Sequence, residues 1–235
     1  MNDKFPKKII LNGDDFGYSK GVNRGIYEAI EHGVLTSTSI MINRPVAKEA
    51  KRLAKYKHIS IGIHLDLTEE GIKRWLKIGE ILTWSSARIT NEFNKQMNAF
   101  QKIVGRMPDH IDSHHHIHRL TKFRSIVEKY SNQNSIPVRS INATFVTKFY
   151  GRSLSKWNDP RCVTQERLIT AIENLPKGIH EIMCHPGYVD AGLVKSGTTY
   201  LKQREYELKA LTSPKVKNYL SNNSSIRLIS WKEVI

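Results

Sequence analysis

Cysteine is scarce in this chain of 235 residues, which contains only Cys162 and Cys184. The two thiols lie far apart and form no CxxC motif, so the sequence excludes a disulfide scaffold and a four-cysteine zinc site. Free thiols without a disulfide pattern are typical of proteins in the reducing cytoplasm. We therefore expect a cytoplasmic protein.

Long hydrophobic runs are missing as well. Near the N-terminus only Ile9, Ile10 and Leu11 are consecutive aliphatic residues, which is too short for the apolar region of a signal peptide. No apolar run approaches the ~18 residues of a membrane span. We expect no membrane partner, and the sequence leaves the oligomeric state open, a homodimer included.

Acidic residues are outnumbered by basic ones, 22 against 37, which gives a formal net charge of +15. Such a charge occurs in nucleic-acid-binding proteins, where basic residues cluster on one surface. Here Lys and Arg are spread along the chain, and no basic run with interleaved aromatic residues stands out. We expect no nucleic-acid partner, although a basic nucleic-acid binder is the alternative from a different class.

Nucleotide-binding glycine motifs are also absent, because no GxGxxG or GxxxxGK[ST] follows an apolar run. Short apolar or β-branched runs alternate instead with amphipathic stretches. Strands are predicted over 7–11, 35–43, 59–67, 109–114, 137–144, 179–185 and 226–231. Helices are predicted over 20–33, 46–56, 91–105, 122–133, 164–175 and 200–212, with Ser213 and Pro214 beginning another. The stretch that ends at about residue 89 is predicted to be irregular.

Seven strands that alternate with helices predict a parallel sheet. We interpret residues 1–235 as a single-domain α/β protein, a distorted β/α barrel of about seven parallel strands; an open doubly wound sheet is the competing arrangement. In barrels the chemistry lies at the carboxyl ends of the strands. Ionisable residues recur at those ends in this sequence: Asp14, Asp15, His64, Asp112, the histidines of HHHIH (114–118), Arg139 and His185.

Two stretches indicate a metal site. NGDDFG (12–17) sets two carboxylates side by side after an apolar strand, and HIDSHHHIH (110–118) holds five histidines. Adjacent buried carboxylates repel each other unless a cation shares their space. Two imidazoles and one carboxylate with open positions form a catalytic metal site. One aspartate would then bind the metal and the other would act as general base, while His185 could protonate the leaving group.

Each of these features also has an ordinary structural explanation. An aspartate pair can cap the following helix, and a histidine run can be a solvated loop. A lone histidine on a strand, such as His64, is usually a hydrogen-bonded polar residue, and His185 could hold the turn that follows it. Arg139 could orient the aspartates or the substrate, or form a structural salt bridge. Convergence at the ends of several strands favours the functional explanation.

Four motifs, in order, resemble those of the YdjC-like carbohydrate deacetylases, a family that includes chitooligosaccharide deacetylases. They are NGDDFGYSKGVNRGIYEAIEHGVLTSTSIMIN, IGIHLDLT, PDHIDSHHHIH and EIMCHPGYVD, and the match covers about residues 8–190. The resemblance implies a distorted β/α barrel with one divalent metal ion. It also implies hydrolysis of the acetyl groups of N-acetylated sugars, such as short oligosaccharides of N-acetylglucosamine.

The resemblance implies roles for single residues: Asp15, His64 and His114 as metal ligands, Asp14 as base and His185 as acid. On an extended chain His115 faces away from His114, whereas His116 returns to the same side and could contact Asp14 or the substrate. The other candidates for substrate contact are Arg139, Tyr188, Trp75 and Trp84. Mixed nitrogen and oxygen ligands favour Zn²⁺, manganese or iron, and the resemblance also admits Mg²⁺.

Two other classes compete with this interpretation. His114-x-His116 resembles the HxH pair of amidohydrolase-like metal hydrolases, which would act on another amide, although that pair normally ends the first strand and not the fourth. A metal-binding module without catalysis is the second. For this family the chain is short after IGIHLDLT and around 145–165, where loops shape the sugar pocket, so the exact acetylated substrate stays open.

Overall fold

Seven parallel strands form one curled sheet in the computed structural model, which describes residues 7–152 and 159–234. The strands are β1 (Lys7–Phe16), β2 (Ser37–Ile40), β3 (Ser60–Leu65), β4 (Ile111–Ser113), β5 (Thr144–Val146), β6 (Gly178–Cys184) and β7 (Ile226–Leu228). Their order is β4-β3-β2-β1-β6-β5, and β7 pairs with the first residues of β1. The sequence predicts a single domain over residues 1–235. Of these, residues 1–6, 153–158 and 235 lie outside the described part.

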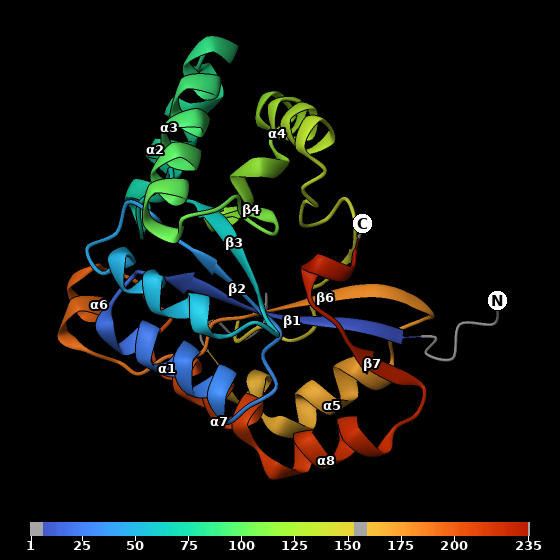
Figure 1. Ribbon diagram of the computed structural model, residues 1–235. Coiled ribbons are helices and arrows are strands. Elements are labelled where there is room, and N and C mark those ends of the chain that lie inside the picture. The colour runs from blue at the N-terminus through green and yellow to red at the C-terminus, as the bar shows by residue number, and fades with distance from the viewer. Residues whose placement is uncertain (1–6, 153–158, 235) are drawn as a thin grey trace.

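The sheet forms an open half-barrel (Figure 1). β4 and β5 end the strand order, and the gap between them is spanned in the described residues by an isolated bridge from Ile111 to Val138. Hydrogen bonds from Ile111 N–H to Pro137 O and from Arg139 N–H to Ile111 O accompany it. The predicted parallel α/β fold is confirmed, and its barrel is incomplete.

Helices cover the outside of the sheet in two groups (Figure 1). One group contains α1 (Lys20–Glu31), α5 (Gln165–Glu173), α6 (Ala191–Lys195), α7 (Lys202–Thr212) and α8 (Pro214–Asn222). The other contains α2 (Ile72–Thr83), α3 (Ser86–Val104) and α4 (Thr121–Asn134). Short 3₁₀ helices are η1 (Ala47–Lys55), in place of the α-helix predicted over 46–56, η2 (His114–Arg119), η3 (Pro160–Val163) and η4 (Trp231–Glu233). None of the described helices has both the length and the apolar character needed to cross a membrane.

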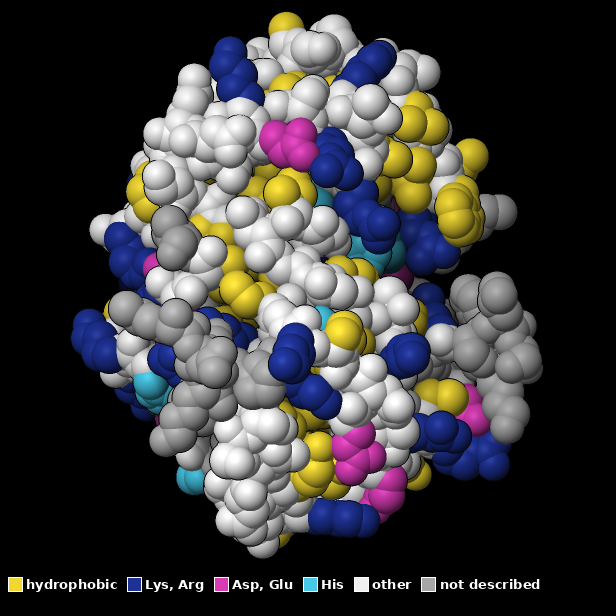
Figure 2. Space-filling view, turned by 90° about the vertical axis from the view of Figure 1, so that its right-hand side faces the viewer, with side chains coloured by type: hydrophobic (Ala, Val, Ile, Leu, Met, Phe, Trp, Pro, Cys, Tyr) yellow, Lys and Arg dark blue, Asp and Glu magenta, His cyan; other side chains and the backbone are white. Residues whose placement is uncertain are grey.

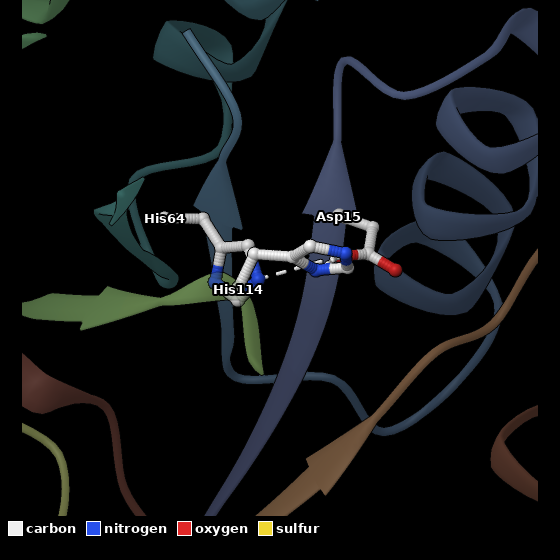
Figure 3. A group of neighbouring side chains, drawn as sticks. All are labelled: Asp15, His64 and His114. Carbon is white, nitrogen blue, oxygen red and sulfur yellow. Dashed lines mark ion pairs between the residues drawn. The ribbon is translucent and has the colours of Figure 1, made fainter. Parts of the chain in front are cut away.

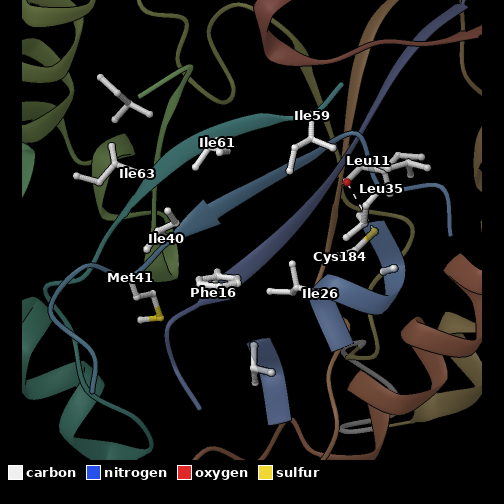
Figure 4. Packing of buried hydrophobic residues seen from close by; sticks show 14 of the residues in the cluster. Leu11, Phe16, Ile26, Leu35, Ile40, Met41, Ile59, Ile61, Ile63 and Cys184 are labelled. Carbon is white, nitrogen blue, oxygen red and sulfur yellow. Dashed lines mark hydrogen bonds between the residues drawn. The ribbon is translucent and has the colours of Figure 1, made fainter. Parts of the chain in front are cut away.

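α1 shows how the sequence attaches a helix to this sheet. Ser19 caps the helix, since its hydroxyl accepts a hydrogen bond from Val22 N–H. The apolar face of the helix packs against β1, where Ile26 lies near Phe16 of the strand and near Leu35, which precedes β2 (Figure 4). Full burial of each such side chain stabilises the fold by about 1.5–3 kcal/mol.

The stretch predicted to be irregular is largely helical, so that prediction is wrong. It holds α2 and the beginning of α3, which starts at Ser86 because the Ser85 side chain caps it. The apolar residues Trp75, Leu76 and Leu82 of α2 are exposed. Because these apolar residues do not all lie on the buried face, the segment lacks the single apolar face by which a surface helix is recognised in a sequence.

The strand predicted over 137–144 is also wrong, because β5 begins only at Thr144. Pro137 has no N–H to donate, and Ser140 adopts a left-handed φ of 65°. The Asn142 side chain accepts a hydrogen bond from Val138 N–H and closes a turn. This turn carries Arg139 into the interior of the half-barrel.

The two faces of the sheet differ in chemistry. Along β1, Ile9 and Leu11 join the large apolar core under the helices. The alternate residues Ile10, Asn12 and Asp14 belong to the opposite face. Ile10 packs there in a small second cluster, and Asn12 and Asp14 are hydrogen-bonded to each other. The interior face therefore becomes polar toward the carboxyl ends of the strands.

His110 lies deep in this interior. Its ring stacks on the indole of Trp231, with centroids 5.1 Å apart and an interplanar angle of 17°. Both ring nitrogens are buried and have no hydrogen-bond partner among the described residues. Burial lowers the pKa of His110 to about 4, so the ring is neutral in the folded protein at neutral pH.

We expect His110 to weaken the fold in acid. Between its ordinary pKa of 6.5 and about 4, the unfolded chain binds a proton there that the folded chain does not, so stability falls as the pH falls. One pKa unit corresponds to about 1.4 kcal/mol, which makes the loss about 2–3 kcal/mol at pH 4.5. His110→Phe keeps the stacking and removes the titration. Urea unfolding at pH 7 and 4.5 should show a smaller fall in the variant; an equally steep fall would contradict the assignment.

Candidate metal and catalytic site

Asp14 and Asp15 both line one cavity although they are neighbours on β1. Regular alternation would direct their side chains to opposite faces of the sheet. The pairing of β1 with β2 shifts register between Gly13 and Phe16, and Asp15 has a left-handed φ of 70°. An irregularity of this kind redirects a side chain. It brings both buried carboxylates to the same side.

Asp15, His64 and His114 converge on one point, as Figure 3 shows. Asp15 Oδ1 lies 3.3 Å from His64 Nε2 and 3.3 Å from His114 Nδ1. The three residues come from β1, from β3 and from the residue directly after β4. Parallel strands end at one edge of the sheet, which is why residues so far apart in sequence meet here.

The far nitrogen of each histidine is held by a carboxylate. His64 Nδ1 lies 2.7 Å from Asp112 Oδ1, its partner in the register of β3 and β4. His114 Nε2 lies 3.1 Å from Glu70 Oε1, which also accepts a hydrogen bond of 2.9 Å from the Tyr18 hydroxyl. Such partners fix the orientation of a metal-binding histidine. They leave His64 Nε2 and His114 Nδ1 directed toward Asp15.

Asp15 is held in the same manner by Arg204, whose Nη2 donates to Asp15 Oδ2 at 2.6 Å. The other oxygen, Oδ1, is buried and has no hydrogen-bond partner among the described residues. A buried carboxylate oxygen without a partner is costly. A divalent cation shared with the two histidine nitrogens would satisfy it, so these residues fit a metal ion.

The charge around His64 also favours a cation. Burial lowers the pKa of His64, but the charges of Asp112 and Asp14 outweigh it and raise this pKa to about 10. The interior therefore attracts positive charge at this position. A metal ion bound there would displace a proton from the imidazole.

Asp14 has different partners. Arg139 donates to it twice, from Nη1 to Oδ2 and from Nη2 to Oδ1, both at 2.7 Å, and Asn12 Nδ2 donates to Oδ1 at 2.7 Å. Asp14 also has ligand spacing with His64 and Asp112, but the guanidinium already neutralises that group. Burial raises the pKa of Asp14, and the charge of Arg139 brings it below its usual value. Asp14 is thus an ionised carboxylate at neutral pH.

Arg139 is fully buried and does not line the cavity, so it contacts Asp14 and not the cavity itself. Its Nη2 also lies 2.8 Å from Asp112 Oδ2 and 2.7 Å from Glu181 Oε1. Of the alternatives open from the sequence, this geometry supports orientation of Asp14 within a buried ion-pair network.

His185 lines the cavity from the neighbouring strand. Gly13 pairs with Cys184 in the register of β1 and β6, so Asp14 and His185 follow side by side. The backbone N–H of His185 donates to Glu207, and Nδ1 is buried at 3.9 Å from Glu207 Oε1. These contacts hold His185 in the cavity lining, beside the end of β1 that carries the carboxylates.

The histidine run after β4 is not extended, which corrects the expected alternation of its side chains. It forms η2, with left-handed φ angles of 53° at His115 and 57° at His116. The His115 ring lies 3.9 Å from the His114 ring, and its Nδ1 lies 2.7 Å from Thr68 Oγ1. His116 packs edge-on against Phe145, and both histidines line the cavity.

The structure does not bring Tyr188 or Trp84 to this cavity. The Tyr188 hydroxyl donates to Glu28 at 2.5 Å, and the Arg24 guanidinium covers its ring at 3.9 Å. Trp84 directly follows α2 and is buried, and its indole N–H donates to Glu80 at 3.2 Å. Trp75, the third aromatic candidate, does line the cavity.

Sequence reasoning missed the contribution of α7. Arg204 and Glu207 are three residues apart and share one face of this helix. Both are buried, Arg204 against Asp15 and Glu207 against His185 and the Tyr200 hydroxyl. The sequence shows only a charged helix here. The one signal that could have indicated the site is the spacing of three residues between Arg204 and Glu207, which many solvent-exposed helices also contain.

The cavity has a volume of about 430 Å³, within the range of small-ligand sites. The carboxylates and histidines form one part of its lining. Another part is Arg74, Trp75 and Ile78 of α2, and a third includes Tyr150, Arg152 and Tyr200. On the face shown in Figure 2, histidines are visible between basic and hydrophobic side chains, and Lys and Arg are scattered over the surface.

Comparison with known proteins identifies the family. The YdjC-like protein family matches residues 8–222. The chain belongs to this family. Among the relatives of this YdjC-like chain, a carbohydrate deacetylase of Geobacillus stearothermophilus is 35% identical over 97% of this chain and 98% of that protein. A chitooligosaccharide deacetylase of Serratia marcescens is 34% identical over 90% of this chain and 93% of that protein.

Solved structures confirm the fold of this YdjC-like chain. A protein of Enterococcus faecalis, named for a proposed role in cellobiose-phosphate cleavage, superposes with a TM-score of 0.79 at 26% identity, covering 97% of this chain and 98% of that one. A family 4 acetyl xylan esterase of Clostridium thermocellum, in complex with a cobalt ion, has a TM-score of 0.54 at 12% identity, covering 97% and 89%. At that identity the second likeness shows the fold alone.

Proposed function

We propose that this protein is a metal-dependent deacetylase that hydrolyses the acetamide groups of N-acetylated sugars, in particular short N-acetylglucosamine oligosaccharides. One observation carries the proposal: buried Asp15 Oδ1 accepts no hydrogen bond among the described residues and lies 3.3 Å from both His64 Nε2 and His114 Nδ1, in a cavity that Asp14 and His185 also line. The carbohydrate substrate is supported by the names of the relatives at 34–35% identity.

The chemistry follows from the placement of the residues. A divalent ion held by Asp15, His64 and His114 would polarise the acetamide carbonyl and lower the pKa of water from ~15.7 to about 7. Asp14, kept ionised by Arg139, accepts the proton of the water that attacks the carbonyl carbon. His185, which directly follows the adjacent strand β6, donates a proton to the departing amine. The products are acetate and a sugar with a free amine.

The identity of the metal belongs to this proposal. Two imidazole nitrogens and one carboxylate oxygen favour Zn²⁺, manganese or iron, and Mg²⁺ is the alternative from the family resemblance. The cytoplasmic location expected from the sequence stays a prediction, and so does a homodimer as one of the oligomeric states that the sequence allows.

Acetate release from N-acetylated mono- and disaccharides tests the proposal directly. Protein stripped with a chelator and reloaded separately with Zn²⁺, Mn²⁺, Fe²⁺ or Mg²⁺ should release acetate and free amine in equal amounts with at least one ion. An Asp14→Asn variant purified and reloaded in the same way is the control for contaminating hydrolases, because loss of the general base lowers activity without removing the metal-binding residues. Absence of acetate with every sugar and ion, while another amide is hydrolysed, would favour an amidohydrolase-like function instead.

A further inference from the structure

We propose that α2 forms a second sugar subsite, in which the exposed indole of Trp75 stacks on the ring next to the one that loses its acetyl group. This inference rests on the proposed deacetylase function. It adds the residue that would contact the second sugar unit of such an oligosaccharide and set the preference for it over the monosaccharide.

The first observation is the exposure of Trp75, at 64% of its surface. A singly exposed apolar side chain is common on protein surfaces, so what sets Trp75 apart is that its indole also borders the cavity. Two other exposed apolar residues of α2, Leu76 at 71% and Leu82, do not belong to the cavity lining, whereas Trp75 does. The exposed indole thus borders the same cavity as the proposed metal-binding and catalytic residues.

The second observation is the position of α2 relative to the reaction centre. Glu70, bonded to His114, lies two residues before the first residue of the helix. Trp75 follows within the first turn or so, at a rise of ~1.5 Å per residue. The indole therefore stands beside the metal-binding residues, at the exposed rim, while Asp14, Asp15 and His64 lie buried at the floor. When the acetamide of one sugar ring reaches these buried residues, the sugar unit linked to that ring lies at the rim of the cavity, beside Trp75.

The third observation is the chemistry of the walls. The Arg74 guanidinium lies 4.6 Å from the centre of the Trp75 ring system, and Ile78 extends the apolar surface one turn further. Tyr150 lies in another part of the lining, stacked on Tyr200 at 5.2 Å. A pyranose ring has apolar C–H faces and a rim of hydroxyls. Aromatic faces pack against the former, and guanidinium donors bind the latter.

The test compares N-acetylglucosamine with its β-1,4-linked dimer on the metal-loaded enzyme. Trp75→Ala should raise KM for the dimer roughly tenfold, with kcat nearly unchanged, because stacking of this kind is lost. KM for the monosaccharide should change less than about twofold. Trp75→Phe should recover most of the loss. Leu76→Ala is the matched control, since Leu76 is the next residue and equally exposed but does not line the cavity.

Two results would overturn the subsite: Trp75→Ala changing KM for both sugars by the same factor, or for neither. In both cases wild type still releases acetate, so the deacetylase function would stand. If wild type released no acetate from either sugar, the proposed function itself would fail. Dimer turnover without monosaccharide turnover in wild type, abolished by Trp75→Ala but not by Leu76→Ala, would support the subsite.

Discussion

Replacement of Asp14 by asparagine is expected to lower kcat by about 10²–10⁴-fold, the usual contribution of a positioned general base. Metal content and KM should stay near wild type, because Asp14 donates nothing to the three-residue group of Asp15, His64 and His114. The fold should also persist, since Arg139 would keep its ion pairs with Asp112 and Glu181. Metal analysis and steady-state kinetics on the same preparation measure all three quantities.

Asp15→Asn is the matched variant, one residue away and equally buried. It removes the charge that faces both histidines, so metal affinity should fall and added metal should restore part of the activity. If Asp14→Asn lost its metal while Asp15→Asn kept it, the two roles would be reversed. If both variants kept metal and full activity, the pair would be structural and the mechanism wrong.

Removal of either imidazole is expected to abolish stable metal binding. An open site with three protein ligands has no spare donor, so His64→Ala and His114→Ala should each lose most of the bound metal after dialysis, with activity falling in parallel. Elemental analysis gives the stoichiometry. Circular dichroism checks that the variants fold.

His115→Ala is the matched control for these variants, and it also separates two candidate groups. Glu70, His114 and His115 have ligand spacing too, but His115 Nδ1 is engaged by Thr68 and Glu70 by Tyr18. We therefore expect His115→Ala to keep its metal. Retention of metal in His64→Ala together with its loss in His115→Ala would place the ion in the second group.

The sequence by itself determined the parallel α/β fold and the residues that its strand ends bring together. A strand appears in a sequence through local features, such as the alternating apolar residues of ISIGIHLDL. Six of the seven predicted strands exist, with shifted boundaries. The meeting of Asp15, His64 and His114 then follows from a rule of topology, because parallel strands present their carboxyl ends at one edge. The motifs of a known family assigned the roles.

Only the tertiary structure decided how those side chains are aimed. Asp15 faces the histidines because β1 loses register with β2 at that residue, which depends on the partner strand and not on local sequence. Arg204 and Glu70 hold ligand atoms across 189 and 44 residues of chain. Contacts between residues so far apart produce no repeating pattern of residue types in the sequence, so they cannot be predicted from it. The helix of Trp75 was missed because Trp75, Leu76 and Leu82 are exposed, so α2 lacks the one-sided apolar pattern of a helix that packs on a core.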